Sequence, residues 1–175
     1  MRGIVVLVGA LVVAGCGGGE AMKVPESGVA DSIVVTSPAF GESQPIPREY
    51  TCKGTGRPPE LAWRGVPADA KSLALVVSDP DAPKGTFVHW VLYDLPARDG
   101  ALPSGEVPPG AREADNSAGK KGWYPPCPPS GTHHYQFTVY ALREPASAQS
   151  TQGVLDEIDR LAVARGRLTG LVAAG

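Results

Sequence analysis

Hydrophobic residues fall into short runs from residue 32 onward, with the length and alternation of β-strands. Four runs stand out, at residues 33–37, 72–78, 87–95 and 133–142. They are rich in β-branched and aromatic side chains, which favour strands. The run at 72–78 is apolar on both alternating faces, so it predicts a central strand that is covered on both sides.

One segment near the C-terminus has helical spacing instead. Ser150 or Thr151 is expected to cap this helix, Arg165 to lie in its last turn, and Gly166 to end it in the left-handed conformation. Its apolar positions recur three or four residues apart: Val154, Leu155, Ile158, Leu161 and Ala162. A short final strand is expected over residues 167–175. The predicted fold is all-β dominated, a β-sandwich of two sheets with a C-terminal helix and a short final strand.

Composition agrees with this fold class. The chain has 175 residues, enough for one domain with a core, and its 22 Gly and 18 Pro provide for many turns. The stretch at residues 98–129 has no clear pattern, and irregular segments of this length in compact domains are usually functional. The formal net charge is −2 and no basic cluster occurs, so we expect no nucleic-acid partner.

The N-terminus has the pattern of an export signal. Arg2 precedes an apolar run at residues 4–14, which is too short to span a bilayer and suits the core of a signal peptide. The motif "VAGC" then resembles a bacterial lipobox and implies a signal peptide at 1–15 and lipid on Cys16. We expect a flexible tether over 16–31 and a folded domain over 32–175. The alternative is an ordinary secretory signal with an incidental cysteine.

This reading predicts an exported protein, anchored by lipid to the outer face of the cytoplasmic membrane or to the outer membrane. If Cys16 is lipidated, Cys52 and Cys127 remain. Two cysteines in an oxidising compartment predict a disulfide. The alternative is a pair of free buried thiols, since the sequence does not show that they meet.

Polar residues of catalytic or binding type lie at the ends of two predicted strands. Asp79 and Asp81 follow the strand at 72–78, and His89 lies early in the next strand. Alternation places His133 and Tyr135 on one face of their strand and His134 on the other. Each residue alone is also compatible with a structural role, the aspartates as turn residues and the histidines as buried scaffold.

Four motifs taken together resemble the phosphatidylethanolamine-binding protein family, and more narrowly its bacterial branch, the Raf kinase inhibitor-like proteins. The motifs are "DPDAP" at 79–83, "FVHWVLYDLP" at 87–96, "PPCPPSG" at 125–131 and "HHYQFTVYAL" at 133–142. The segment "YTCKGTGRPPELAWRGVP" at 50–67 and the final helix and strand also fit that branch. The resemblance spans about residue 33 to the C-terminus.

The resemblance implies a two-sheet sandwich with a small anion pocket at one end. By position in the motifs, the ligand-binding residues would be Asp79, Asp81, His89, Pro126, His133 and Tyr135. The loop at 123–129 would form the rim of the pocket. An unusual turn after the aspartate motif makes the Ala82–Pro83 bond a candidate for a cis peptide.

The sequence departs from the family pattern at two places. His134 stands where the family usually has arginine, and alternation turns this position away from the pocket. Tyr124 and Pro125 stand where the family has glycines. Proline has no backbone N–H, so a donor to a phosphate is lost if that position faces the ligand.

The expected function is non-catalytic binding of a phosphorylated or phospholipid headgroup of the phosphoethanolamine type. Histidine and tyrosine can donate hydrogen bonds to a phosphate, and a carboxylate can accept from an ammonium group. We expect no cofactor and no metal. Two alternatives stay open: a protein that inhibits a kinase or a protease, with an unknown protein partner, and a metal or hydrolase site built from the aspartate and histidines.

Overall fold

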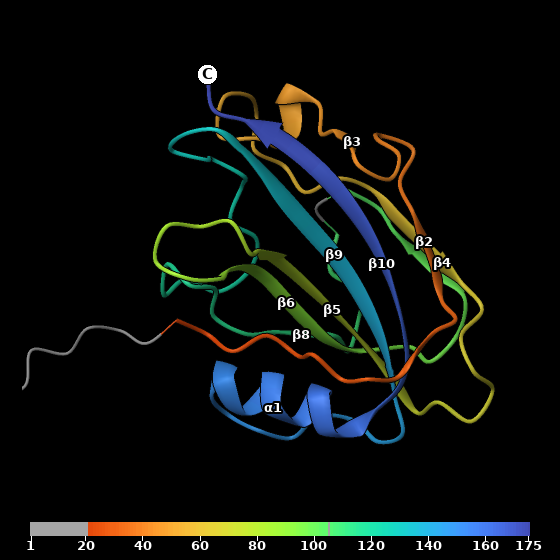
Figure 1. The fold of residues 1–175 in the computed structure, drawn as a ribbon. Coiled ribbons are helices and arrows are strands. Elements are labelled where there is room, and N and C mark those ends of the chain that lie inside the picture. The colour runs from red at the N-terminus through yellow and green to blue at the C-terminus, as the bar shows by residue number, and fades with distance from the viewer. Residues whose placement is uncertain (1–20, 105) are drawn as a thin grey trace, which may run out of the picture.

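A computed structural model describes residues 21–104 and 106–175 (Figure 1). The predictions for the signal peptide and for lipid on Cys16 lie outside the described residues. No helix in the described part of the chain is long and apolar enough to cross a membrane.

Two sheets are built from the described residues. The larger sheet has the order β1-β10-β9-β5-β6-β8, with β3 also beside β10. Its strands are β1 (Ala30–Asp31), β3 (Gln44–Pro45), β5 (Ser72–Asp79), β6 (Phe87–Leu95), β8 (Arg112–Glu113), β9 (Thr132–Leu142) and β10 (Ala162–Ala173). The smaller sheet has the order β2-β4-β7. Its strands are β2 (Val34–Thr36), β4 (Leu61–Arg64) and β7 (Gly100–Leu102). A short 3-10 turn spans Arg48–Tyr50, and the helix α1 spans Thr151–Leu161.

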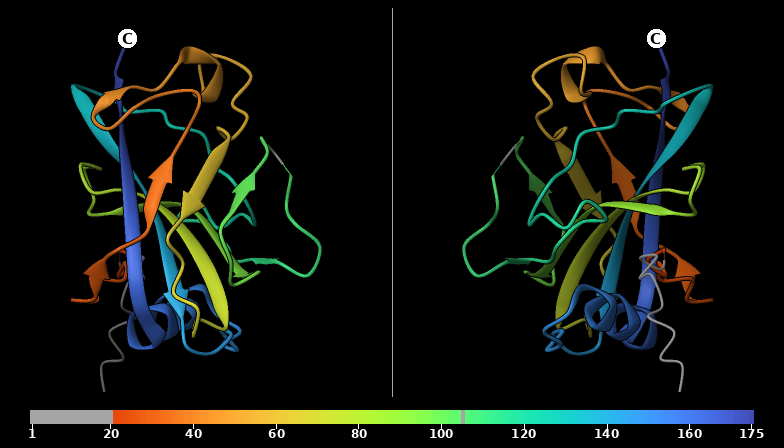
Figure 2. Two further views of the ribbon diagram at one scale, coloured as in Figure 1. Left: turned by 90° about the vertical axis from the view of Figure 1, so that its right-hand side faces the viewer. Right: turned by 90° about the vertical axis from the view of Figure 1, so that its left-hand side faces the viewer.

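The larger sheet is the middle layer of the molecule, with the smaller sheet on one face and α1 on the other (Figures 1 and 2). All eight residues of β5 are buried, because alternate side chains enter two different cores. Leu73, Leu75 and Val77 face the smaller sheet, whereas Ala74 and Val76 face α1. The structure therefore confirms the central, doubly covered strand predicted from the apolar run.

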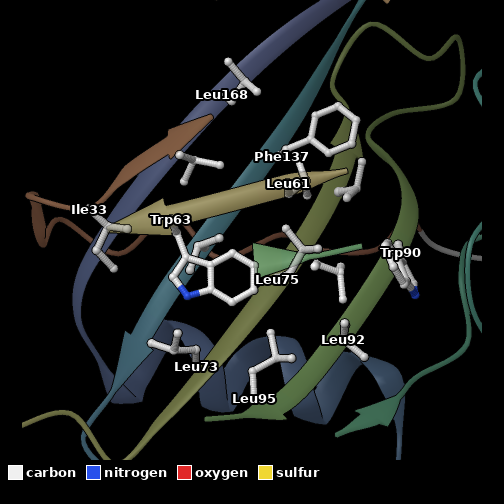
Figure 3. Close-up of a cluster of buried hydrophobic side chains, with 14 of the residues drawn as sticks. Ile33, Leu61, Trp63, Leu73, Leu75, Trp90, Leu92, Leu95, Phe137 and Leu168 are labelled. Carbon is white, nitrogen blue, oxygen red and sulfur yellow. The ribbon is translucent and has the colours of Figure 1, made fainter. Parts of the chain in front are cut away.

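The core between the sheets is rich in leucine and tryptophan. Figure 3 shows Leu61 and Trp63 of β4 on one side of this core, and it labels on the other side Leu73, Leu75, Trp90, Leu92, Leu95 and Phe137. Three predicted strands, at 72–78, 87–95 and 133–142, agree with β5, β6 and β9 to within one residue. The strand β4 was not predicted, because its four residues are too few to show an alternating pattern clearly.

The end of the helix differs from the prediction. Ser150 is the N-cap, and its Oγ accepts a hydrogen bond from the Gly153 N–H at 3.1 Å. The helix ends at Leu161, however, and β10 begins at once, so Arg165 and Gly166 lie in a strand of twelve residues. Glycine is needed at 166 because the backbone of Ile33 passes close by, and a Cβ would lie 1.8 Å from the Ile33 carbonyl oxygen. The final strand is long because it pairs with β9 along almost its whole length.

The prediction of a flexible tether up to residue 31 is wrong for its described part. Residues 21–31, called the N-terminal strap below, lie against α1 and the larger sheet (Figure 1). Gln152 accepts from the Lys23 N–H at 2.9 Å and donates to the Lys23 carbonyl at 3.1 Å. The buried Tyr140 hydroxyl donates to the Pro25 carbonyl at 3.0 Å. The strap is ordered because its backbone groups find partners on the fold, which its polar sequence does not reveal.

Candidate ligand-binding site

A cavity of about 300 Å³ opens at the end of the sandwich where β5 ends and where β6 and β9 begin. The described residues that line it are Asp79, Ala82, Pro83, Phe87, His89, Tyr124, Cys127, Pro129, His133 and Tyr135. The structure thus brings together four of the residues singled out in the sequence: Asp79, His89, His133 and Tyr135. All four are buried, each exposing 5% of its surface or less.

Asp79 and His133 form a buried pair at the base of this arrangement. His133 Nδ1 lies 2.7 Å from Asp79 Oδ2, and the carboxylate can only accept, so Nδ1 carries the proton. The other carboxylate oxygen accepts from the Asp81 N–H at 2.9 Å. The carboxylate is therefore fixed from both sides, and the ring nitrogen Nε2 of His133 is the one left for a ligand.

His89 is oriented in a similar way by a different partner. Its Nδ1 donates to the Tyr124 carbonyl at 2.7 Å, so its Nε2 is also left for a ligand. Burial lowers the pKa of His89 below its ordinary value of 6.5, although the Tyr124 carbonyl and the charge of Asp79 act in the opposite direction. Rings crowd it on two sides, with Phe87 at 4.7 Å and Tyr135 edge-on at 5.2 Å between centroids.

Tyr135 supplies a hydroxyl that stays protonated. Burial first, and then the negative charge of Asp79, raise the pKa of Tyr135 well above its usual value. The hydroxyl can therefore donate a hydrogen bond to an anion at any physiological pH. Together the cavity offers one phenol as a donor and two imidazoles that donate through Nε2 when they are charged, beside one fixed carboxylate.

The loop at 123–129 forms part of the cavity wall, through Tyr124, Cys127 and Pro129. A disulfide joins Cys127 to Cys52, with 5.5 Å between the Cα atoms. Two hydrogen bonds also join the segment that contains Cys52 to the loop at 123–129. The Cys52 N–H donates to the Pro126 carbonyl at 3.0 Å, and Trp123 Nε1 donates to the Gly56 carbonyl at 2.8 Å.

Two residues predicted for the pocket are not among those that line it. Pro126 is buried, and its carbonyl accepts a hydrogen bond from the Cys52 N–H. Asp81 lies outside the cavity and holds the exposed His134, accepting from its backbone N–H at 2.7 Å and pairing with its Nδ1 at 2.8 Å. The position of His134, facing away from the cavity, agrees with strand alternation. Pro125 is also absent from the cavity lining and packs toward Gly56 instead.

The structure adds lining residues that the sequence reading did not assign to the site. Phe87 is the clearest case, because it lies two positions before His89 on the same strand face, a relation visible in the sequence. Ala82 and Pro83 also contribute, through the turn that follows Asp81. Among residues 21–104 and 106–175, no three His, Cys, Asp or Glu side chains are grouped so that they could share a metal ion.

The prediction of a cis bond at Ala82–Pro83 is wrong, since every described peptide bond is trans. The turn is closed by a hydrogen bond of 3.1 Å from the Gly85 N–H to the Ala82 carbonyl. Pro83 therefore occupies the second position of a four-residue turn, where a trans proline fits because its fixed φ suits that position.

Comparison with known proteins gives consistent matches. The family model described as phosphatidylethanolamine-binding protein matches residues 36–173. A Mycobacterium tuberculosis protein named "Putative lipoprotein LppC" is 39% identical over an alignment that covers 92% of this chain and 90% of that protein. The solved structure of CT736 from Chlamydia trachomatis, described as a homologue of the same family, is 35% identical with a TM-score of 0.76. It covers 83% of this chain and 100% of its own.

A second solved structure, E. coli YbcL, is described as a member of the mammalian family. It is 29% identical with a TM-score of 0.77 and covers 82% of this chain and 99% of its own. The matched region includes all the described residues that line the cavity.

Proposed function

Since the chain belongs to the phosphatidylethanolamine-binding protein family, we propose that it is a lipid-anchored, extracytoplasmic binding protein for phosphate-bearing headgroups. The headgroup is of the phosphoethanolamine type, whether on a phospholipid or on a small molecule. The observation that carries this proposal is the buried Asp79–His133 pair in one cavity with His89 and Tyr135.

The mixed lining suits a ligand with both charges. The phenol can donate to phosphate oxygens, and so can the two Nε2–H groups when the imidazoles are charged, which also makes their hydrogen bonds stronger. Asp79 Oδ1 and Oδ2 each retain a lone pair beyond the hydrogen bonds that they accept, so the carboxylate can also receive an ammonium group. A bare anion would meet the charge of Asp79 without this compensation.

The lining favours binding over covalent catalysis. Among the ten described residues that form it there is no serine, threonine or lysine, and Cys127 is held in a disulfide. These ten residues therefore offer no serine, threonine, free cysteine or lysine that a neighbouring base could activate as a nucleophile. The histidines are instead committed through Nδ1 to fixed acceptors, which leaves Nε2 of each ring for a bound group.

The anchor rests on the lipobox motif that ends at Cys16 and on the 39% identity to a relative named as a lipoprotein. Detergent phase partitioning tests it. The native protein should enter the detergent phase, and a Cys16→Ser variant should stay in the aqueous phase. Wild-type protein in the aqueous phase would overturn the anchor.

Calorimetric titration tests the pocket. Glycerophosphoethanolamine, inorganic phosphate and ethanolamine are titrated separately into the wild type and into a His133→Ala variant. Because both charges of the ligand have partners in the cavity, the first should bind most tightly, and the variant should weaken it. Binding of inorganic phosphate alone with equal or higher affinity would overturn the headgroup assignment.

A further inference from the structure

The chain enters the described fold beside the cavity. Ala21, the first described residue, lies against Gly85, where an added Cβ would be only 2.9 Å from the Cβ of Ala21. Gly85 closes the turn that contains Ala82 and Pro83, and both of these residues line the cavity. The start of the N-terminal strap therefore contacts the turn that forms part of the cavity wall. Figure 1 shows the start of the N-terminal strap and the turn between β5 and β6 on the same side of the molecule.

The N-terminal strap is held along its length by independent contacts. Gln152 pairs with both backbone groups of Lys23, and Asp159 accepts from the Glu26 N–H at 2.9 Å. Between these two residues Tyr140 holds Pro25, and further along the strap β1 pairs with β10. The folded domain therefore begins at residue 21 or before it, and not at residue 31.

This position limits how far the cavity can move from an anchor at residue 16. Five residue steps separate Cys16 from Ala21, and a chain reaches at most about 3.5 Å per residue, or about 17 Å in all. A tether running freely to residue 31 would reach about three times as far by the same measure. The opposite end of β5, by contrast, is about 25 Å further away, because a strand of eight residues rises about 3.3 Å per residue.

We propose that the N-terminal strap holds the cavity end of the domain against the membrane that carries the lipid on Cys16, so that the cavity takes its headgroup from that same bilayer. The inference rests on the proposed function for the anchor and for the ligand class. A cavity of about 300 Å³ has room for a headgroup and not for acyl chains. The lipid would therefore stay in the bilayer while its headgroup is bound.

Fluorescence quenching tests the orientation. The full lipid-anchored protein is labelled at Lys84→Cys, in the turn beside the cavity, or at Asp69→Cys, in the exposed loop before β5. Each is reconstituted in vesicles whose lipids carry a nitroxide on the headgroup. Quenching should be several-fold stronger at position 84 than at 69. Equal quenching, or stronger quenching at 69, would overturn the proposal.

Two changes should abolish the difference without touching the cavity. The first inserts about twenty Gly and Ser residues between Gly18 and Gly19, a flexible span of about 25 Å. The second is Gln152→Ala with Asp159→Ala, which removes the hydrogen bonds that hold Lys23 and Glu26 of the N-terminal strap to α1. Gln149→Ala is the matched control, because Gln149 bonds only within its own loop. A difference that survives both changes would show that the strap does not set the orientation.

Competition distinguishes a bilayer headgroup from a soluble ligand. On phosphatidylethanolamine vesicles, soluble glycerophosphoethanolamine should bind the anchored protein more weakly than on phosphatidylcholine vesicles, because the neighbouring headgroups compete at high effective concentration. The Gly and Ser insertion between Gly18 and Gly19 should reduce this loss of affinity. If position 84 is quenched more strongly than position 69 but no glycerophosphoethanolamine binds, the proposed ligand is wrong. The role of the strap in orienting the domain is then still supported. If the native protein lacks lipid, the anchor fails, and coupling Cys16 to a maleimide lipid still decides the orientation.

Discussion

Two aspartate–histidine pairs lie side by side in this protein and differ in almost everything except their geometry. The Nδ1–Oδ2 distances are 2.7 Å for His133 with Asp79 and 2.8 Å for His134 with Asp81. The first pair exposes only 7% and 5% of its side chains, whereas the second exposes 53% and 39%. Because successive residues of a strand point to opposite faces, one step along β9 separates a cavity residue from a surface residue.

The comparison shows that burial, and not the contact distance, decides how much free energy an ion pair contributes. In the buried pair the imidazole has lost its water, so it depends on Asp79 and on a ligand for hydrogen bonds. In the exposed pair water can replace either partner, which leaves little to gain from the contact. The two pairs are therefore matched controls for each other.

Removing the carboxylate should separate the pairs most strongly. Asp79→Ala leaves His133 buried without a partner and the Asp81 N–H without its acceptor, and it should lower the free energy of unfolding by about 3 kcal/mol. Asp81→Ala should cost less than about 1 kcal/mol. Urea denaturation at pH 7 measures both. Equal losses would show that the burial difference has no energetic meaning.

Binding should separate the histidines next. His133→Ala and His89→Ala should each weaken glycerophosphoethanolamine by about 1.5–3 kcal/mol, the range for hydrogen bonds to charged groups. His134→Ala should change the affinity little, because its side chain lies outside the cavity. Calorimetry at pH 6 compares the three variants. Similar losses at positions 133 and 134 would mean that the histidines are scaffold and do not contact the ligand.

The sequence predicted much of this contrast. Alternation alone turned His133 and Tyr135 to one face and His134 to the other, and the apolar run identified β5 as the central strand. The family resemblance added that Asp79 and His89 belong to the same pocket. These predictions succeed because each depends on a local repeat or on a motif whose residues lie close together in the chain.

What the sequence could not predict depends on contacts between distant segments. The partner of Asp81 is fifty-three residues away, and nothing in the aspartate motif distinguishes it from Asp79. The backbone of the N-terminal strap is bound by Gln152 and Tyr140, which lie more than a hundred residues later. Glycine is a residue type common at helix ends, yet Gly166 is needed because the backbone of Ile33 passes too close for a Cβ.

The pH dependence of binding should sharpen the role of His89. Burial lowers the pKa of free His89, and a bound phosphate should raise it, because the anion stabilises the charged ring. Affinity should therefore be strongest below the free pKa and should fall as pH rises through the higher pKa of the complex.

Glycerophosphoethanolamine is the right probe for this titration, because a phosphodiester has no second ionisation near pH 6, unlike a phosphate monoester. Calorimetry from pH 5 to 8 on the wild type and on His89→Ala gives the comparison. The slope should be shallower in the variant. An identical slope in both proteins would assign the pH dependence to another group.

The smallest effect is expected at the exposed pair, through the pKa of Asp81. Hydrogen bonds from the His134 backbone and then from its side chain lower this pKa below its ordinary value of 3.8. The carboxylate therefore adds stability that is present above about pH 4 and is lost as pH falls through the lowered pKa. Because the side chain is more than a third exposed, solvent screening keeps the gain below about 1 kcal/mol.

Asp81→Asn should thus lower the free energy of unfolding slightly at pH 7 and have almost no effect near pH 2. Combining it with His134→Ala in a double-mutant cycle isolates the side-chain part of the interaction from the backbone part. High salt should weaken the side-chain coupling, since exposed charges are screened. A coupling as large as that of the buried pair would overturn the distinction, because water would then have failed to compete at an exposed site.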